Sequence, residues 1–409
     1  MTQRLYYHDA FLYDFEAEVR EVVPASGAER RAGVVLDRTA FYPTSGGQVY
    51  DTGWLATAGE QRHRVVEVGE REDGSVVHYL EAGERLPVGR LVRGTVDAER
   101  RRDHMQQHSG QHVLSAAFVR LFQMPTASFH MGEEYCSIDL ATDALGAEQV
   151  VAAERLANEV IAENREVAVR FVTRSEAESL GLRKIPATER DELRLVEIAD
   201  FDLCACGGTH VANTGQIGSV LLRKTERVRQ GWRVELVCGM RAVASARADF
   251  SALSEAAGLF SSKLGETPQM ARKMQDEARA LRKENEDLLE QLAEAEARRL
   301  LAEAVEVGGS KRVVQAYSDR GLGFVKLVAQ RMVRLDANVV ALLAASTPTP
   351  ALVFAQSAGL GGDMGALVKA TLAALGGRGG GAKDFAQGGL PAGADTEAAL
   401  ARALAGLSG

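Results

Sequence analysis

Residues 263–305 restrict the possible folds more than any other segment, because their apolar side chains recur at heptad spacing. The first set of core positions consists of Met274, Leu281, Leu288 and Ala295. The second set that follows from it consists of Ala278, Asn285, Leu292 and Arg299. These are mediocre core residues, so the pattern favours one long amphipathic helix, packed as an arm or a hairpin, over a stable isolated coiled coil.

The segments on either side of this helix differ in their patterning. The first part has β-branched runs such as VVLDRTAFYP and RVVEVGE between glycine-bearing turns, which is typical of a small barrel or sandwich. From Asp97 onward, stretches with helical periodicity alternate with strand-like stretches. We therefore predict an α+β multi-domain protein, with an N-terminal β-barrel over 1–93, a central α+β domain over 94–245, a helical arm over 246–308 and an α/β domain over 309–409.

The composition limits which classes of protein this chain can belong to. The chain has 409 residues, of which 46% are hydrophobic and 25% are charged, as in ordinary soluble proteins. The net charge of −8 gives no whole-chain indication of nucleic-acid binding, which needs only a local basic patch. Four cysteines do not make a disulfide framework in a chain of this length, so a reducing compartment is expected. With neither a signal peptide nor a membrane-length apolar run, the sequence predicts a cytoplasmic protein without a membrane partner.

Three histidines, His104, His108 and His112, follow one another every four residues in a segment with helical periodicity. Two imidazoles on successive turns of a helix lie on one face and can bind a single metal ion. The spacing allows either the first or the second pair. Because polar residues surround these histidines, a solvated polar stripe without metal is the alternative at this stage.

The stretch CACGGTH at 204–210 places Cys206 and His210 around two glycines. Glycine allows the backbone to come close to a bound group. Together with two helix histidines, this pair makes three nitrogen donors and one sulfur donor, a set that Zn²⁺ accepts. Four protein ligands are normally a mark of structural zinc, which therefore competes with a catalytic site. A redox pair of Cys204 and Cys206 is the weaker alternative, because its spacing is C-x-C and no thioredoxin-like context precedes it.

Two other stretches carry weaker signals. TAFYPTSGGQ, residues 39–48, is compatible with a strand and a loop, and its last residue, Gln48, is either a positioned amide or a turn residue. Near the C-terminus, GGRGGGAK is predicted as a glycine-rich loop that carries Arg378 and Lys383. Such a loop suits a phosphate contact or a plain surface loop.

Four motifs occur in order along the chain: TxFYPxxGGQ, HMQQHSGQH, FHMGEEYCSIDL, and CGGTH followed by VANTGQIG. Together they resemble the editing half of alanyl-tRNA synthetases, and most of all the freestanding alanyl-tRNA editing proteins of the AlaX family. The ligands that this resemblance implies for one Zn²⁺ per chain are His108, His112, Cys206 and His210. His104 and Cys204 are thereby left out. The chain departs from the family pattern at Ala98, where tryptophan is common, and at Thr44-Ser45, and neither departure touches a ligand.

The C-terminal part, with GGGAKDFAQGG, resembles the DHH-associated domain of the same synthetases. That resemblance implies contact with tRNA, for which Arg378 and Lys383 are the candidates, and a homodimer formed through the preceding helical arm.

The resemblance implies a zinc-dependent deacylase that hydrolyses the ester of Ser-tRNA(Ala), with Gly-tRNA(Ala) as a further possible substrate, and spares Ala-tRNA(Ala). It implies that Thr39 recognises the serine hydroxyl, and we predict that Gln48 orients water or the ester. Since the chain begins at the predicted barrel, we expect it to act in trans. Further pocket candidates are His130, Asp139, Gly207, Gly208 and Thr209.

Two alternative functions are weighed against editing. A nuclease or phosphoesterase of the DHH class is suggested by the C-terminal part and the triplet Asp103-His104-Met105, but that chemistry needs several clustered aspartates. A non-catalytic, zinc-containing tRNA-binding module is the other alternative, and the intact TxFYPxxGGQ motif argues against it.

Overall fold

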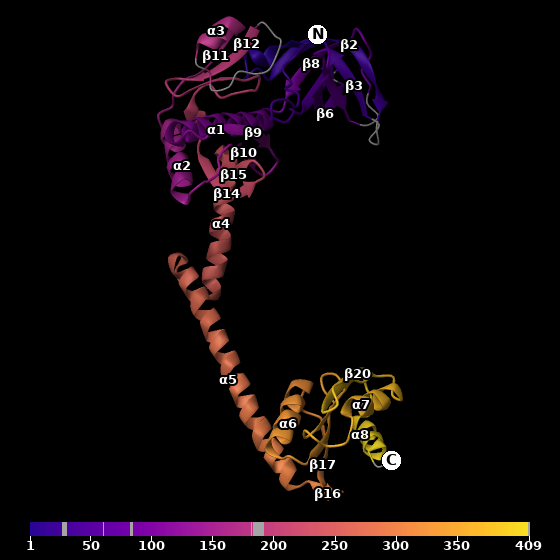
Figure 1. The fold of residues 1–409 in the computed structure, drawn as a ribbon. Helices are drawn as coiled ribbons and strands as arrows, with labels where there is room; N and C mark the ends of the chain where they lie inside the picture. The colour runs from indigo at the N-terminus through magenta and orange to yellow at the C-terminus, as the bar shows by residue number, and fades with distance from the viewer. Residues whose placement is uncertain (27–30, 60, 82–84, 181, 183–191, 408–409) are drawn as a thin grey trace. The chain divides into compact units, whose positions relative to one another are not determined.

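The computed structural model describes residues 1–26, 31–59, 61–81, 85–180, 182 and 192–407. The chain forms two compact units, Met1–Glu255 and Ala256–Gly409, which are described separately (Figure 1). Among the described residues, none of the helices has both the length and the apolar character of a membrane span.

The N-terminal unit begins with a closed six-stranded barrel, in the order β2-β3-β7-β6-β5-β8. Its strands are β2 (Asp14–Ser26), β3 (Arg31–Leu36), β5 (Gly53–Thr57), β6 (Arg62–Glu70), β7 (Val76–Leu80) and β8 (Leu91–Val96). Alternating side chains fill it: Leu55 is fully buried in the barrel core, whereas its neighbour Trp54 contacts Arg62 and Arg64. This closed sheet confirms the predicted N-terminal barrel.

Two short strands, one before β2 and one after β3 in the chain, pair with each other in parallel. The pair consists of β1 (Gln3–Arg4) and β4 (Arg38–Thr39). The strand β4 ends at Thr39, the first residue of TAFYPTSGGQ. Its pairing with β1 therefore fixes the position of the start of this stretch.

The helix α1 (Ala98–Phe122) follows the barrel, and it is capped by Asp97, whose carboxylate accepts from the Arg100 N–H. The helix contacts α2 and the strands β9, β10, β13 and β15, so its middle is buried even at polar positions. Near its start, Arg101 and Asp51 form a fully buried ion pair that ties the helix to the barrel.

Two small antiparallel sheets and the helix α2 (Ala147–Ala162) complete this unit. One sheet has the order β14-β15-β10-β9 and consists of β14 (Val220–Val228), β15 (Gly231–Cys238), β10 (Cys136–Leu140) and β9 (Thr126–Met131). The other has the order β11-β12-β13 and consists of β11 (Val167–Thr173), β12 (Glu192–Ile198) and β13 (Asp202–Ala205). The short helix α3 (Arg174–Ser179) follows β11, and α4 (Gly239–Leu259) follows β15.

The second unit contains a six-stranded sheet in the order β16-β17-β18-β19-β21-β20. Its strands are β16 (Val305–Val307), β17 (Ser310–Tyr317), β18 (Val339–Ala345), β19 (Ala351–Gln356), β20 (Arg378–Gly381) and β21 (Phe385–Gly389). Two helices pack on one face, α5 (Thr267–Ala302) and α6 (Leu322–Leu335). The other face is covered by α7 (Met364–Ala373) and α8 (Thr396–Gly406) (Figure 1). Covered on both faces, β18 is buried along its whole length.

The long helix predicted over 263–305 is present as α5, but most of its predicted core positions are exposed. Met274, Leu281 and Leu288 are 51%, 64% and 56% exposed. Only the C-terminal turns of α5 pack against the sheet and α6, at Ala293 and Ala297. Heptad spacing therefore located the helix without showing which of its positions the fold buries.

The prediction of a glycine-rich loop near the C-terminus is wrong, because this segment forms the antiparallel hairpin β20–β21 at the edge of the sheet. The glycines allow α7 to lie directly on the strands: a Cβ at Gly388 would lie 2.1 Å from Cδ1 of Leu372. Arg378 and Lys383 are exposed on this hairpin and in its turn.

Candidate metal centre

The helix α1 carries His108 and His112 one turn apart, and both side chains are buried. His104, one turn earlier, is buried at the joint with the barrel, where its Nδ1 lies 3.9 Å from Oδ1 of Asp51. The second pair of histidines, and not the first, therefore faces the segment described next.

The CGGTH segment follows β13 and returns to α1, and its second glycine sets how closely the two approach. A Cβ at Gly208 would lie 2.1 Å from Cε1 of His108, a distance that no side chain can adopt. At Gly207 the nearest atom to such a Cβ is 3.5 Å away, so there is room for a methyl group. The absence of a side chain at Gly208 is thus a condition for the cluster to form.

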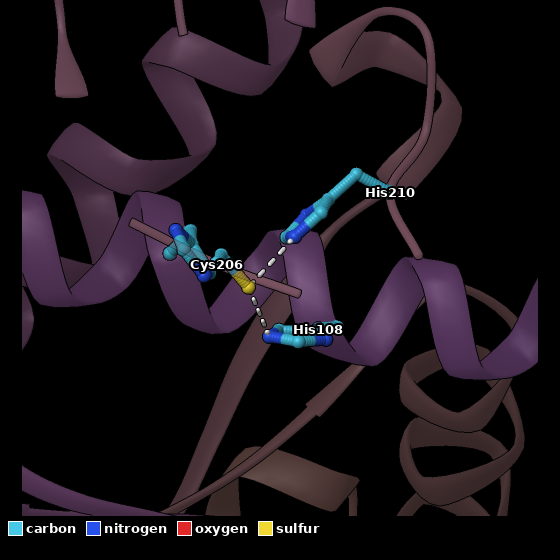
Figure 2. A group of neighbouring side chains, drawn as sticks. His108, Cys206 and His210 are labelled. Carbon is cyan, nitrogen blue, oxygen red and sulfur yellow. Dashed lines mark hydrogen bonds between the residues drawn. The ribbon is translucent and has the colours of Figure 1, made fainter. Parts of the chain in front are cut away.

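Four donor atoms lie within 4.8 Å of one another, from His108, His112, Cys206 and His210. Figure 2 shows the sulfur of Cys206 between two of the rings: Sγ lies 3.4 Å from Nε2 of His108 and 3.3 Å from Nε2 of His210. Cys204 stands outside this group, with its sulfur 3.6 Å from the carbonyl oxygen of Ala205. One sulfur and three imidazole nitrogens form a set that could hold Zn²⁺.

Gln48 is fully buried, and both ends of its side-chain amide are engaged. Its Oε1 accepts from Nδ1 of His108 at 2.7 Å and from the N–H of Thr209 at 3.1 Å, and its Nε2 donates to the Thr209 hydroxyl at 2.8 Å. Because an amide oxygen only accepts, His108 carries its proton on Nδ1 and presents the lone pair of Nε2 to the cluster. Gln48 therefore orients one donor of the cluster, a role that the sequence did not indicate.

A polar group also lies near Nδ1 of each of the other two imidazoles, as a hydrogen-bond partner for His210 and at ion-pair distance for His112. Nδ1 of His210 lies 3.1 Å from the hydroxyl of Ser109, and Nδ1 of His112 lies 3.4 Å from Oδ2 of Asp202. Metal-binding histidines are usually held in this way through the ring nitrogen that does not bind the metal. The chemistry of the donors and of their outer partners thus fits a bound metal ion.

The electrostatics of the cluster favour an anionic sulfur. Burial alone would raise the pKa of the Cys206 thiol, but the imidazoles of His108, His210 and His112 lower this pKa well below its usual range. Burial acts to lower the pKa of His112, yet the Cys206 thiolate and Asp202 raise it to about 9. Burial lowers the pKa of His210 to about 3. In the metal-free cluster these shifts favour a Cys206 thiolate beside a His112 imidazolium, and metal binding would release that proton.

Arg194 on β12 holds the CGG turn, and sequence reasoning missed it. Its Nη1 donates to the carbonyl oxygens of Cys206 at 2.7 Å and Gly208 at 3.0 Å, and its Nε donates to that of Tyr7 at 3.1 Å. The signal in the sequence was an arginine inside the apolar run LRLV, all four residues of which are buried. Such a residue is buried only when its guanidinium finds acceptors.

A cavity of about 600 Å³ lies beside this arginine and reaches the cluster. Its lining includes Arg4, Tyr7, Phe171, Arg194, Cys206 and Gly207. Aromatic and cationic side chains thus line the same cavity as Cys206.

The remaining predicted site residues lie elsewhere. Thr39 is fully buried, and its hydroxyl contacts His78 rather than the cluster. His130 and Asp139 lie on one face of the β9–β10 pair, and Phe129, whose ring stacks on a ligand histidine, lies on the other. Asp139 is bound to Arg233 at 2.8 Å. The structure therefore does not bring His130 and Asp139 to the cluster.

Comparison with known proteins gives two family matches. Residues 3–100 match the model described as tRNA synthetases class II (A), and residues 193–235 match the threonyl and alanyl tRNA synthetase second additional domain. The second match contains CGGTH and Arg194.

Individual relatives agree with these matches. The chain is 33% identical to an alanine–tRNA ligase of Thermococcus kodakarensis, over 95% of this chain and 41% of that protein. It is 29% identical to the alanyl-tRNA editing protein AlaX-L of Pyrococcus horikoshii, over 95% of this chain and 94% of that protein. The solved C-Ala domain of Aquifex aeolicus alanyl-tRNA synthetase matches 26% of this chain and 98% of that domain at 20% identity, with a TM-score of 0.24 that supports no argument. The chain spans less than half the length of that ligase, and it is a homologue of alanyl-tRNA synthetases and of an alanyl-tRNA editing protein.

Proposed function

We propose that this chain is an aminoacyl-tRNA deacylase that hydrolyses the ester of Ser-tRNA(Ala) and spares Ala-tRNA(Ala). Its homology to alanyl-tRNA synthetases and to an alanyl-tRNA editing protein supports this activity. The match over 94% of the editing protein supports action in trans, on tRNA that another enzyme has charged.

The observation that carries the proposal is a preorganised donor cluster that opens on a cavity. Cys206, the sulfur donor of a cluster with three imidazoles, belongs to the lining of a cavity of about 600 Å³. Tyr7 and Phe171 offer rings for stacking with a base, and Arg4 adds positive charge on the same wall. A terminal nucleotide in this cavity would place its aminoacyl ester next to Cys206.

The proposed cofactor is one Zn²⁺ per chain, held by His108, His112, Cys206 and His210. When bound, it would supply a Lewis acid for the ester or orient the terminal adenosine. The chain's own residues set the geometry around it: Gln48 directs the imidazole of His108, and Arg194 holds the backbone on both sides of Gly207. We propose Gln48 as a positioning residue of the centre, with Gly207 leaving room for the substrate.

We propose that selectivity depends on Thr39. A buried hydroxyl that pairs with the hydroxyl of serine is left unpaired by alanine, and a site of this kind rejects the smaller substrate. The hydroxyl of Thr39 has buried polar surroundings that suit this function.

The proposed partner is tRNA(Ala) in the cytoplasm, where charged tRNAs are used. Arg378 and Lys383 are exposed cations that would contact its phosphates. The exposed apolar residues Met274, Leu281 and Leu288 of α5 support a homodimer formed through this helix. Replacing both cations by alanine should raise KM for tRNA more than it lowers kcat, and an unchanged KM would remove them from the interface.

One assay tests the proposed function against both alternatives. The protein is incubated with Ser-tRNA(Ala) and with Ala-tRNA(Ala), with and without a metal chelator. Selective release of serine that the chelator abolishes supports editing. Strand cleavage would support a nuclease, and tRNA binding without either reaction would support a binding module.

A further inference from the structure

Thr39 and His78 form a hydrogen-bonded pair inside the barrel. Both side chains are fully buried, and Oγ1 of Thr39 lies 2.8 Å from Nε2 of His78. Nδ1 of His78 lies 3.1 Å from the carbonyl oxygen of Val34. The hydroxyl of Thr39 also accepts from the N–H of Phe41 at 3.0 Å.

The partners of this pair determine which atom carries each proton. A carbonyl oxygen only accepts, so His78 must carry its proton on Nδ1, where it donates to Val34. Burial lowers the pKa of His78 to about 4, so the ring is neutral at physiological pH. Its Nε2 is then an acceptor, and the proton of Thr39 is donated to it.

This arrangement leaves the Thr39 hydroxyl with one remaining hydrogen-bonding position. A hydroxyl has one donor and two acceptor positions. The donor is committed to His78 and one acceptor position to Phe41, so only one lone pair is left. A group that pairs with Thr39 must therefore donate to it, as the hydroxyl of a seryl ester can and the methyl group of alanine cannot.

We propose that His78 is a positioning residue for substrate selectivity, which holds Thr39 as an obligate acceptor for a hydroxyl-bearing aminoacyl group. The inference rests on the proposed deacylase function and concerns its discrimination between serine and alanine. Without His78, the Thr39 hydroxyl turns freely and can donate to other acceptors, including the ester or water. Its lone pair is then no longer reserved for the substrate hydroxyl.

Two substitutions of His78 separate positioning from packing. His78→Gln places an amide oxygen near the position of Nε2, so Thr39 keeps its acceptor, whereas His78→Leu removes it. The control is Val76→Ala, a truncation of a buried residue on the same face of the same strand. The measurement is the ratio of kcat/KM for Ser-tRNA(Ala) to that for Ala-tRNA(Ala), together with bound zinc.

We expect His78→Leu to lower the ratio by about tenfold or more, because the loss of one hydrogen bond changes an equilibrium or rate by roughly a factor of ten. Bound zinc should be unchanged. His78→Gln and Val76→Ala should keep the ratio. Thr39→Val should lower it equally, and adding His78→Leu to Thr39→Val should lower it no further. A folded His78→Leu protein with the wild-type ratio would overturn the inference.

The protonation pattern offers a test that does not depend on a folded leucine variant. Nitrogen-15 NMR of the wild-type protein should show His78 protonated at Nδ1 and not at Nε2, and the opposite tautomer would overturn the inference. If the wild type hydrolyses neither charged tRNA, the proposed function fails and this inference fails with it. If it hydrolyses Ser-tRNA(Ala) and His78→Leu discriminates normally, only the inference about His78 fails.

Discussion

Gln48 is the residue at which the geometry of the metal centre can be tested most directly. Its buried amide makes three hydrogen bonds, to Nδ1 of His108 at 2.7 Å and to the N–H and hydroxyl of Thr209 at 3.1 and 2.8 Å. The substitution Gln48→Ala removes all three. It leaves two buried N–H groups without an acceptor, one on the imidazole of His108 and one on the backbone of Thr209.

The magnitude follows from these two orphaned donors. Each buried unsatisfied donor costs about 1–3 kcal/mol, so Gln48→Ala should lower the free energy of unfolding of the metal-free protein by about 2–6 kcal/mol. Loss of an outer partner of a metal ligand typically weakens metal binding by about 10–100-fold. Zinc affinity should fall within that range, because His108 is no longer held with Nε2 toward the cluster.

The matched control is Gln48→Glu, which keeps two carboxylate oxygens where His108 and Thr209 need acceptors. The Thr209 hydroxyl can turn and donate to it, so zinc affinity should stay within about tenfold of wild type. Zinc affinity is measured by competition with a chromophoric chelator, and stability by urea unfolding without metal. If Gln48→Ala binds zinc with wild-type affinity and loses only hydrolysis, the residue orients water or ester and our assignment is wrong.

Three further outcomes are expected. Cys206→Ala should lower zinc affinity by more than about 100-fold while Cys204→Ala keeps it, and equilibrium dialysis of both decides whether the ligand register is correct. Gly208→Ala should lose zinc and about 1–3 kcal/mol of stability to the clash on α1, whereas Gly207→Ala should keep both; equal unfolding midpoints would refute the close approach. Burial lowers the pKa of His78 to about 4 in the folded chain, whereas it is near 6.5 in the unfolded chain. The neutral ring therefore contributes stability that is complete above about pH 6.5 and is lost as the pH falls toward 4. In urea unfolding across that range, the wild type should lose about 3 kcal/mol more than His78→Gln; equal pH dependence in both proteins would contradict this expectation.

Patterns that depend on near neighbours in the chain could be read from the sequence. The alternation in VVLDRTAFYP and RVVEVGE indicated the barrel, and heptad spacing indicated α5. The prediction of a loop near the C-terminus was wrong because glycine has no local preference for a strand. The glycines of this hairpin let α7 pack directly on the sheet, and no pattern of neighbouring residues in the sequence encodes that long-range contact.

The chemistry of the site divides in the same way. Spacing put imidazoles on one helix face and a thiol beside a glycine turn, since four residues make one helical turn and glycine permits tight backbone geometry. Family resemblance then chose among the candidates. The residues that orient those donors come from distant segments: Gln48 lies 60 positions from His108, and Ser109 lies 101 positions from His210.

What the sequence by itself determined was the set of side chains able to bind a metal and the elements that carry them. Only the tertiary structure decided which ring nitrogen each imidazole presents, that Arg194 holds the thiolate turn, and that Thr39 gives its proton to His78. The reason is physical. Tautomers and hydrogen-bond directions depend on the partner that a buried group meets, and burial, which makes an unpaired group costly, is a property of the packed chain.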